Sequence, residues 1–164
     1  MQQEKLNITV TFDVVAVYLE FKKPAATVAA ELFTRLQNSD VGVDLISLTP
    51  LRRSCSGLSF SVLNRDFSKV LKAAAQLKDE NDPLRLEVSG GYAKITLCGV
   101  LLAEASDSAS GFFRALSAAA PETVLISAAD TTLSVLVCMA DLDKILAAIE
   151  QYFPDAETEY RPEI

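Results

Sequence analysis

The amino-acid sequence predicts an α+β fold in which one structural unit occurs twice in tandem. Three observations support this prediction. The sequence matches itself at a separation of 75 to 80 residues, each copy alternates strand-like and helix-like segments in one order, and the helix-like segments are apolar on one side only. The length of 164 residues alone allows one domain or two small ones, so the repeat decides between them.

The repeat is visible when the sequence is shifted against itself. A shift of 80 positions matches residues of a helix-like segment and the strand after it: Phe33 with Phe113, Leu36 with Leu116, and Leu45-Ile46-Ser47 with Leu125-Ile126-Ser127. A shift of 75 positions matches the next strand and helix: Leu58-Ser59 with Leu133-Ser134, Val62 with Val137, Asp66 with Asp141, and Lys69 with Lys144. The five-residue difference falls around Thr49 to Gly57, whose Pro, Gly and Ser content predicts a longer loop in the first copy.

The first copy predicts four strands and two helices. Its strands are rich in β-branched and other apolar residues: residues 14–21, 43–49, 58–63 and 84–88. Its helices follow the first and third strands, and each carries one apolar stripe at helical spacing. The first helix begins near Thr27 and the second follows the N-cap candidate Asp66, with stripes formed by Val28, Leu32, Phe33 and Leu36 and by Phe67, Val70, Leu71, Ala74 and Leu77.

The second copy repeats this order as far as its second helix. Its predicted elements are a strand over residues 93–99, a helix over 107–119, strands over 123–127 and 133–139, and a helix from Asp141. The residues after this helix are charged and bounded by prolines, which disfavours a central strand. We therefore expect residues 155–164 to form a C-terminal tail, which leaves the second copy one strand short.

One predicted strand is left over at the other end of the chain. Residues 8–12 precede the first copy, and we expect this strand to complete the second unit. The first domain then comprises residues 13–90, and the second comprises residues 1–12 together with 91–154. Each domain would pack two helices on one face of its own four-stranded sheet. An ordinary hairpin of residues 8–12 with residues 14–21 is the alternative.

Composition and missing motifs exclude several classes of function. A net charge of −7 without a basic stripe disfavours nucleic acid as a partner. The chain has no histidine and no phosphate-binding glycine motif, so we expect no catalytic residues and no free-standing kinase or dehydrogenase. Three widely spaced cysteines, Cys55, Cys98 and Cys138, predict reduced thiols and no metal site. Without a membrane-spanning run or a signal peptide, we expect a cytoplasmic protein that needs no cofactor.

The order of elements in each copy is that of the ferredoxin-like topology, and the residues themselves point to a family. The segments that carry the resemblance are 29–36, 43–46 and 58–62 in the first copy and 95–99, 111–116, 125–127, 133–137 and 141–146 in the second. In order and spacing they resemble the tandem ACT domains in the C-terminal regulatory region of aspartokinases (aspartate kinases). The resemblance covers nearly the whole chain and includes a second domain completed by the N-terminal strand.

The resemblance implies a non-catalytic allosteric module. Such a module binds an amino acid of the lysine or threonine class at an interface between ACT domains and regulates amino-acid biosynthesis. A homodimer and a catalytic kinase partner are implied as well. No segment resembles the catalytic domain of that family, so the chain is either a regulatory fragment or a stand-alone relative.

The resemblance also implies candidate ligand-binding residues. In the first copy they are Pro24, Ala26, Thr27, Val43, Asp44, Ser47 and Thr49, and in the second copy they are Asp107, Ser108 and Ser127. A carboxylate such as Asp44 could bind a ligand ammonium group. Asp107 is better explained as a helix N-cap, which would disfavour a carboxylate ligand beside it.

Several of these positions depart from the family pattern. Ala26-Thr27 and Ser106-Asp107 stand where the family has Pro-Gly, whose glycine lets backbone amides approach the carboxylate of the effector. Gly42, Leu48 and Ala129 replace an Asn, a Gln and a Ser. These departures favour a second hypothesis, an ACT assembly module that has lost its effector. A third hypothesis, a small enzyme on this scaffold, would have to use Arg52, Arg53 and scattered carboxylates.

Overall fold

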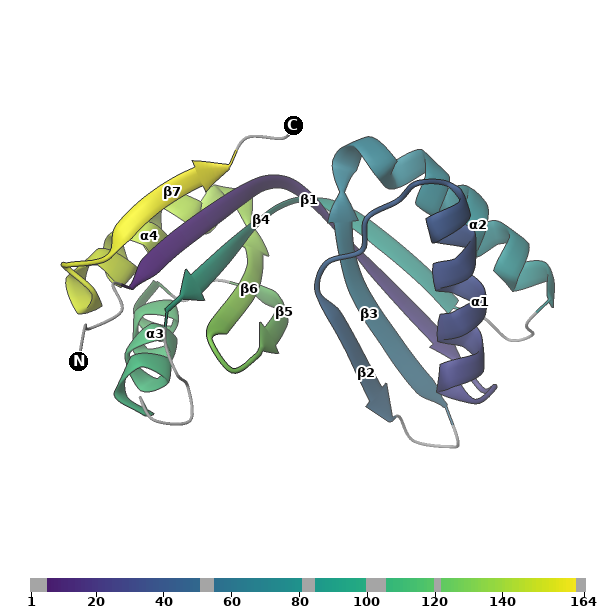
Figure 1. Cartoon of the computed structure of the whole chain (residues 1–164), viewed down its shortest axis with the longest axis horizontal. Coiled ribbons are helices and arrows are strands. Elements are labelled where there is room, and N and C mark those ends of the chain that lie inside the picture. The colour runs from purple at the N-terminus through teal and green to yellow at the C-terminus, as the bar shows by residue number, and fades with distance from the viewer. Residues whose placement is uncertain (1–5, 51–54, 81–84, 100–105, 120–121, 162–164) are drawn as a thin grey trace. The chain divides into compact units, whose positions relative to one another are not determined.

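The structure is a computed structural model that describes residues 6–50, 55–80, 85–99, 106–119 and 122–161 (Figure 1). In chain order its elements are β1 (Asn7–Phe21), α1 (Ala25–Asn38), β2 (Ile46–Pro50), β3 (Ser56–Leu63), η1 (Asn64–Asp66), α2 (Phe67–Glu80), β4 (Arg85–Cys98), α3 (Ser106–Ala119), β5 (Thr123–Ala128), β6 (Thr132–Cys138), η2 (Met139–Asp141), α4 (Leu142–Tyr152) and β7 (Glu157–Arg161). The predicted α+β fold class is confirmed.

The chain divides into two compact units. Unit 1 comprises Met1–Asp13 together with Gly91–Ile164, and unit 2 comprises Val14–Gly90. Each unit has its own apolar core, with buried residues that include Ile8, Ile95, Phe112, Val135 and Ile145 in unit 1 and Val17, Leu32, Phe60, Val70 and Leu77 in unit 2. Two separate cores are what two small packed units require, since each must bury its own helices against its own strands.

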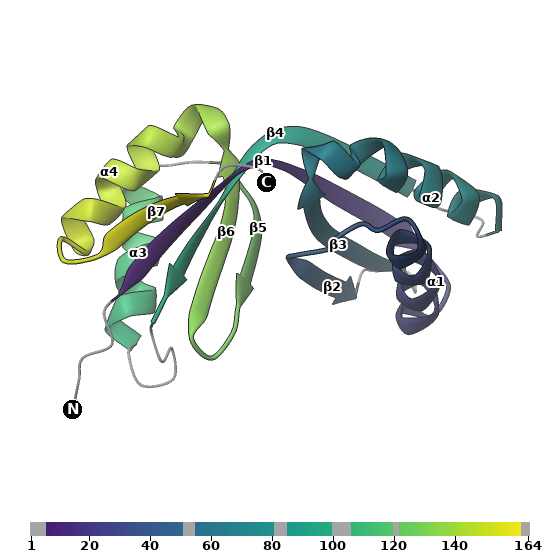
Figure 2. The same cartoon turned by 45° about the horizontal axis from the view of Figure 1, so that its top comes forward.

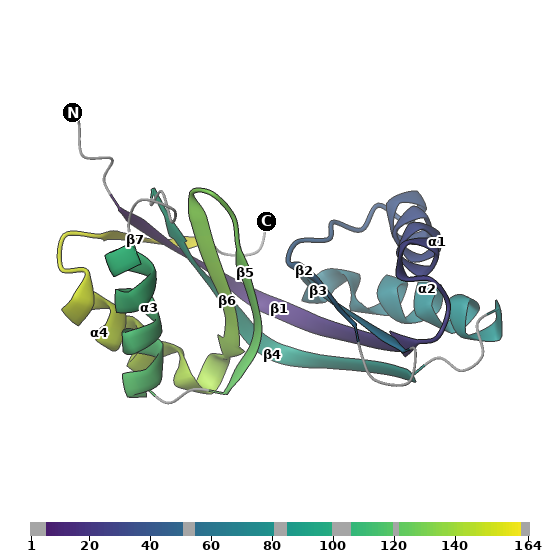
Figure 3. The same ribbon diagram turned by 90° about the horizontal axis from the view of Figure 1, so that it is seen from below.

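In unit 2 the strand order is β2-β3-β1-β4. β1 and β2 both pair antiparallel with β3. Helices α1 and α2 lie on one face of these strands (Figures 1 and 3). Alternate residues of β1 from Val15 to Phe21 face this helix-covered core, because successive side chains of a strand point to opposite faces.

In unit 1 the strand order is β7-β1-β4-β6-β5. β4 and β5 pair antiparallel with β6, and helices α3 and α4 cover one face of these strands (Figure 3). The unit takes the first half of β1 and the second half of β4. The expected contribution of the N-terminal strand to the second repeat is therefore present in the structure, since Ile8 and Val10 belong to the unit 1 core.

The strand pairing reproduces the repeat residue by residue. In unit 2 Ile46 lies opposite Phe60 and Ser47 lies opposite Ser59. In unit 1 the residues at the corresponding shifted positions pair in the same register, Ile126 with Val135 and Ser127 with Ser134. The two halves of the sequence thus share one β-sheet register as well as one order of elements.

Four segments that the sequence predicts as separate strands are joined in the structure into two long strands, β1 and β4. Residues 8–12 and 14–21 form β1, and the segments 84–88 and 93–99 merge into β4 from Arg85 onward. The hairpin alternative is therefore wrong. Both long strands contribute to both units, so one path of pairing joins six strands and β7 pairs with β1 beside it, in place of the two separate four-stranded sheets expected. Asp13 and Gly91, at the chain boundaries of the units, have φ of 51° and 84°, which lets each strand bend without ending.

The C-terminal segment is a second correction. Residues 157–161 of the expected tail form β7, which pairs in parallel with β1 from Asn7 to Thr11 (Figure 2). Its charged residues are compatible with a strand because β7 lies at the sheet edge, where side chains reach water. Tyr160 of β7 stacks on Phe12 of β1 with ring centroids 6.1 Å apart.

Candidate functional site

The N-terminus of α1 carries three of the predicted ligand residues. Pro24 is its N-cap and makes no side-chain cap hydrogen bond, and the first turn contains no acidic residue. The Thr27 and Val28 amides donate to the Pro24 carbonyl at 3.0 and 3.3 Å, while Ala26 and Thr27 are exposed. Because the first amides of a helix have no intrahelical acceptor and carry positive partial charge, this terminus favours an anion.

The N-terminus of α3 is the equivalent place in unit 1, and its charge differs. Asp107 lies in its first turn and is exposed, and Ser108 beside it is half-buried. The Asp107 carboxylate supplies the negative charge that a helix N-terminus favours, so a second carboxylate there would be repelled. The expected N-cap role of Asp107 is therefore corrected: α3 begins at Ser106, so Asp107 lies inside the first turn and acts there through its charge.

The start of β2 fixes Asp44 through its backbone. The Asp44 amide donates to the Ser61 carbonyl at 3.0 Å, and the Leu45 amide donates to the Ser61 hydroxyl, also at 3.0 Å. Ser61 is fully buried and its own amide donates to the Leu45 carbonyl at 2.9 Å. Asp44 is therefore held in place while its side chain is exposed, and Val43 next to it is half-buried.

The structure places the unit 2 candidates at two ends of one strand. Pro50 pairs with Ser56, which pairs with Phe21, so the end of β2 lies near the loop that leads into α1. Thr49 is at that end, whereas Asp44 is five positions away, which is about 16 Å along an extended strand. The predicted set is thus split, with Pro24, Ala26, Thr27 and Thr49 at one end, Val43 and Asp44 at the other, and Ser47 half-buried between them.

The remaining candidate, Ser127, belongs to unit 1. It is half-buried in β5 and pairs with Ser134 of β6, whose hydroxyl lies 2.9 Å from that of Thr96. At a shift of 80 positions Ser127 and Asp107 are the equivalents of the unit 2 candidates Ser47 and Thr27.

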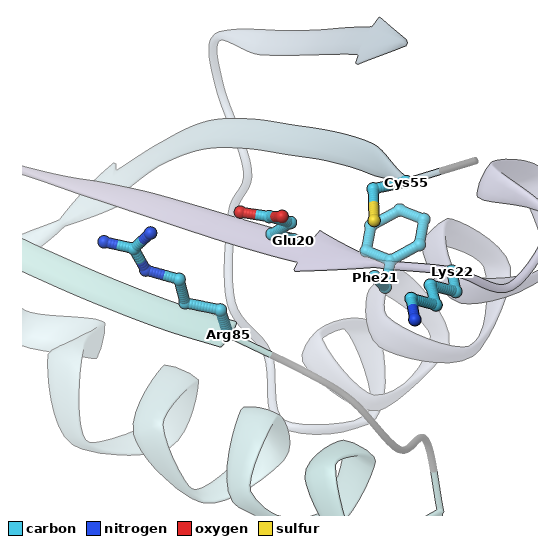
Figure 4. Close-up of a pocket in the computed structure, with 5 residues that line it drawn as sticks. All are labelled: Glu20, Phe21, Lys22, Cys55 and Arg85. Carbon is cyan, nitrogen blue, oxygen red and sulfur yellow. The ribbon is translucent and has the colours of Figure 1, made fainter. Parts of the chain in front are cut away.

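A shallow pocket at the end of β1 escaped the sequence analysis. It has a volume of about 160 Å³ and is lined by Glu20, Phe21, Lys22, Cys55 and Arg85 (Figure 4). These residues come from the end of β1, the residue before β3 and the start of β4. A sequence signal for it would have been hard to find, because charged residues at strand ends are common and only the fold brings these three segments together.

Charged groups surround this pocket. Arg85 forms an ion pair with Glu87 two residues along β4. Burial, followed by the negative charge of Glu20, raises the pKa of Tyr18 above its ordinary value of 10.0, and Arg85 partly offsets this effect. Cys55 is half-buried and forms no disulfide with another described cysteine.

The free edges of both units expose apolar side chains. β2 pairs with β3 and β5 pairs with β6, each at one end of the strand order. Ile46 and Leu48 of β2 are 49% and 51% exposed, and Ile126 of β5 is 41% exposed. Phe113 of α3 is also exposed. Edge strands with apolar side chains favour pairing with another chain.

Among the described residues no group of three or more His, Cys, Asp and Glu side chains could hold a metal ion. No helix within the same residues is long and apolar enough to cross a membrane. Arg52 and Arg53 lie outside the described residues.

Known proteins resemble this chain in structure, while comparison by sequence finds no match. No protein-family model matches the sequence, and no curated protein matches it. The solved regulatory subunit of aspartate kinase from Thermus thermophilus, in a ligand-free form, superimposes with a TM-score of 0.82 and 20% identity, over 92% of this chain and 99% of its own. This chain has the fold of an aspartate kinase regulatory subunit.

Other aspartate kinases show the same fold. The regulatory subunit from Thermus flavus matches with a TM-score of 0.80 and 20% identity, over 90% of this chain and 97% of its own. In the aspartate kinase from Clostridium acetobutylicum the match has a TM-score of 0.76 and 16% identity, and it covers 89% of this chain but 34% of that enzyme. The aspartate kinase regulatory fold of this chain therefore corresponds to about a third of that enzyme.

Proposed function

We propose that this chain is a non-catalytic regulatory module of the aspartate kinase type, which binds an amino acid of the lysine or threonine class between two copies of unit 2. The module would regulate a biosynthetic kinase carried by another polypeptide or another part of a longer one. The observation that supports this proposal is the division of the candidate residues between the two ends of the free edge strand β2.

A dimer would bring the two ends together. If two β2 strands pair antiparallel about a twofold axis, the start of one strand lies beside the end of the other. Asp44 of one protomer would then approach the α1 N-terminus of its partner. The exposed Ile46 and Leu48 supply an apolar surface for this contact, which would remove them from water.

The charges at the two ends suit an amino acid. The α1 N-terminus has no acidic residue in its first turn, so it would take the ligand carboxylate. Asp44 would take an ammonium group, and its carboxylate is exposed for that purpose. Ser47 and Thr49 along β2 could donate hydrogen bonds to the bound ligand.

Thermal unfolding with each proteinogenic amino acid tests effector binding. A ligand that binds the native state stabilises it by about 2.7 kcal/mol at a concentration of 100 Kd, so the effector should raise the Tm by several degrees. If no amino acid raises the Tm at millimolar concentration, effector binding is excluded as the function.

Mixing two variants tests whether the site is shared between protomers. Asp44→Asn and Thr27→Asp should each weaken binding by about tenfold or more when present in both protomers. Mixed dimers would contain one intact site and one doubly altered site, so an equal mixture should recover about a quarter of the wild-type capacity. No recovery would mean that each site is built within one protomer.

The alternative is an assembly module without an effector, favoured by Ala26 and Thr27 at the position of the expected Pro-Gly. Sedimentation separates oligomerisation from ligand binding. Ile46→Lys should yield monomers because a charge at a free edge opposes strand pairing, and the side chain is exposed enough for the fold to tolerate it. Ile126→Lys on β5 is the matched control and should leave the dimer intact. A dimer that binds no amino acid would support the assembly module.

A further inference from the structure

Unit 1 has an edge strand for which unit 2 shows no counterpart among the described residues. In unit 1 the first half of β1 lies between β4 and β7, because β7 pairs with Asn7 to Thr11. In unit 2 the first half of β4 takes the corresponding place, next to the second half of β1. The pairing of β4 with β6 begins only at Tyr92, so no described strand lies on the other side of Arg85 to Val88. We call this stretch the open edge of β4.

A shift of 78 positions relates the two long strands. It matches positions that share a role: Asp13 with Gly91, which both have positive φ, Ile8 with Leu86, and Val10 with Val88. Ile8 and Val10 are buried on the strand that β7 covers, whereas Leu86 and Val88 are only half-buried. The apolar side of the open edge is therefore in partial contact with water.

Helix α2 shows the same difference along one flank. Gln76 of α2 accepts a hydrogen bond from Arg35 of α1, and at about 100° per residue Phe67 and Leu71 lie about half a turn around the helix from Gln76. Because α1 packs on β3 and the strand order is β2-β3-β1-β4, this flank lies on the β4 side. Exposure differs between matched positions of the repeat: Phe67 at 37% against Leu142 at 6%, and Leu71 at 38% against Leu146 at 8%. Phe67 and Leu71 thus form an apolar flank beside the open edge.

We propose that the open edge of β4 binds an extended segment of another polypeptide as an added parallel strand. The backbone of this segment pairs with β4 as β7 pairs with β1, and every second side chain packs against Phe67 and Leu71. The segment therefore carries apolar side chains at alternate positions. Arg85 and Glu87 alternate with the core residues Leu86 and Val88, so their ion pair lies on the opposite face and leaves the apolar flank uncovered.

The direction of β7 favours a partner strand over a second copy of this chain. β7 runs parallel to β1, and the matched edge of β4 accepts a strand in the same direction. Two β4 strands related by a twofold axis would run antiparallel. The proposal goes beyond effector binding and does not depend on it, since β4 and β2 are at opposite ends of the strand order of unit 2.

Two synthetic peptides serve as probes of the full chain. The first has the sequence of residues 155–161, because it contains the strand that the matched edge of β1 accepts. The second carries Thr158→Ile, which adds apolar surface on the core side, since Thr158 pairs with the buried Ile8. By fluorescence polarisation both peptides should bind, the second several-fold more tightly, and a scrambled peptide of the same composition should not.

Hydrogen exchange followed by NMR locates the bound peptide. At nine times its Kd the peptide should slow exchange of the outward amides between Arg85 and Val88 about tenfold, since about a tenth of the edges remain open. Amides between Asn7 and Thr11 should keep their rates. A nitroxide at the peptide N-terminus should broaden the Arg85 amide resonance more than that of Val88. Protection confined to residues 7–11, or the reverse order of broadening, would overturn the proposal.

Variants assign the binding to the apolar flank. Leu71→Lys should weaken peptide binding about tenfold or more, because the apolar contact is lost and the ammonium group must leave water. Met139→Lys is the matched control, since Met139 of unit 1 is 39% exposed, and it should bind as the wild type does. Unchanged binding by Leu71→Lys, or no binding of either peptide by the wild type, would contradict the proposed strand site.

Ile46→Lys separates this site from the proposed dimer. It should bind both peptides with wild-type affinity even if no amino acid binds the chain, so the two proposals can fail separately. Sedimentation of the same variant tests the other occupant. If Ile46→Lys still forms dimers and a further Leu71→Lys makes it monomeric, the open edge binds a second copy and the partner strand is excluded.

Discussion

The two units share one register and one order of elements, yet they differ at the places where a ligand could bind. Unit 2 begins its first helix with Pro24 and no acidic residue, whereas unit 1 has Asp107 in the equivalent first turn. Unit 2 also has Glu20 at a position where unit 1 has Cys98. The common scaffold is set by apolar residues that the repeat retains. A few charged positions differ between the two copies, so under the proposed function the units are expected to have different roles.

Core truncation should have the largest effect and should show whether the units unfold separately. Phe112 and Leu32 occupy the same position in the repeat and are both fully buried. Phe112→Ala should destabilise unit 1 by about 3–5 kcal/mol, and Leu32→Ala should destabilise unit 2 by about 2–5 kcal/mol. Denaturant unfolding followed by hydrogen exchange measures each unit. Equal loss of protection in both units for either variant would mean that they unfold as one.

Giving unit 2 the first-turn residue of unit 1 should weaken its binding of the effector. Thr27 and Asp107 are equivalent at a shift of 80 positions. Thr27→Asp should weaken binding of the effector carboxylate by about tenfold or more, through like-charge repulsion of ~1.4 kcal/mol or more. The same change should stabilise α1 by about 0.3–1 kcal/mol, because acidic residues favour a helix N-terminus.

Calorimetric titration and thermal unfolding of Thr27→Asp measure these two opposite effects. Thr27→Ser is the control, since it adds no charge. If Thr27→Asp lowers the affinity no more than Thr27→Ser does, the α1 terminus is not the carboxylate site.

Each unit has an aspartate just before its second helix, Asp66 before α2 and Asp141 before α4, and their substitution should affect stability by different, smaller amounts. The Asp66 carboxylate is buried and lies 2.9 Å from the Lys69 ammonium, whereas Asp141 is half-buried and makes no side-chain cap hydrogen bond. Asp66→Asn should cost about 1 kcal/mol through lost charge at the start of α2, and Asp141→Asn should cost within about 0.5 kcal/mol. Urea midpoints of the two variants check this order, and a larger cost for Asp141→Asn would contradict it.

The smallest effect concerns Tyr18, which has Thr96 as its equivalent in unit 1. Because the folded state raises the Tyr18 pKa above 10.0, it keeps the proton that the unfolded chain loses. This contribution to stability is complete below pH 10.0 and is lost as pH rises through the folded pKa. Tyr18→Phe should therefore make unfolding less sensitive to pH between about pH 9 and pH 11. An unchanged pH dependence would contradict the assignment.

The sequence predicted the repeat and the helices because matching residues and apolar periodicity record which face of each element is buried. It did not predict that β1 and β4 are continuous. Asp13 and Gly91 look like turn residues, but their positive φ bends a strand that the flanking apolar residues continue. It missed β7 because charges, which oppose a central strand, are acceptable at an edge.

The candidate site was predictable only in part. The candidate residues at the α1 N-terminus and on β2 came from the family resemblance, which matches segments that are each local in sequence. Their separation by the length of β2 could not be found in this way, since it depends on the pairing of three strands. The pocket of Glu20, Cys55 and Arg85 was missed for the same reason, because its members lie far apart in the chain.

The shared strand β1 has a consequence for how the molecule is made. Every element of unit 2 lies before residue 91, but unit 1 needs strands from both ends of the chain, with Asn7 paired to Glu157. Unit 2 can therefore fold once residue 90 has left the ribosome, while Ile8 and Val10 stay uncovered until the C-terminal half emerges. Nascent chains stalled at that stage should thus carry a folded second half of β1 and an apolar first half exposed to chaperones.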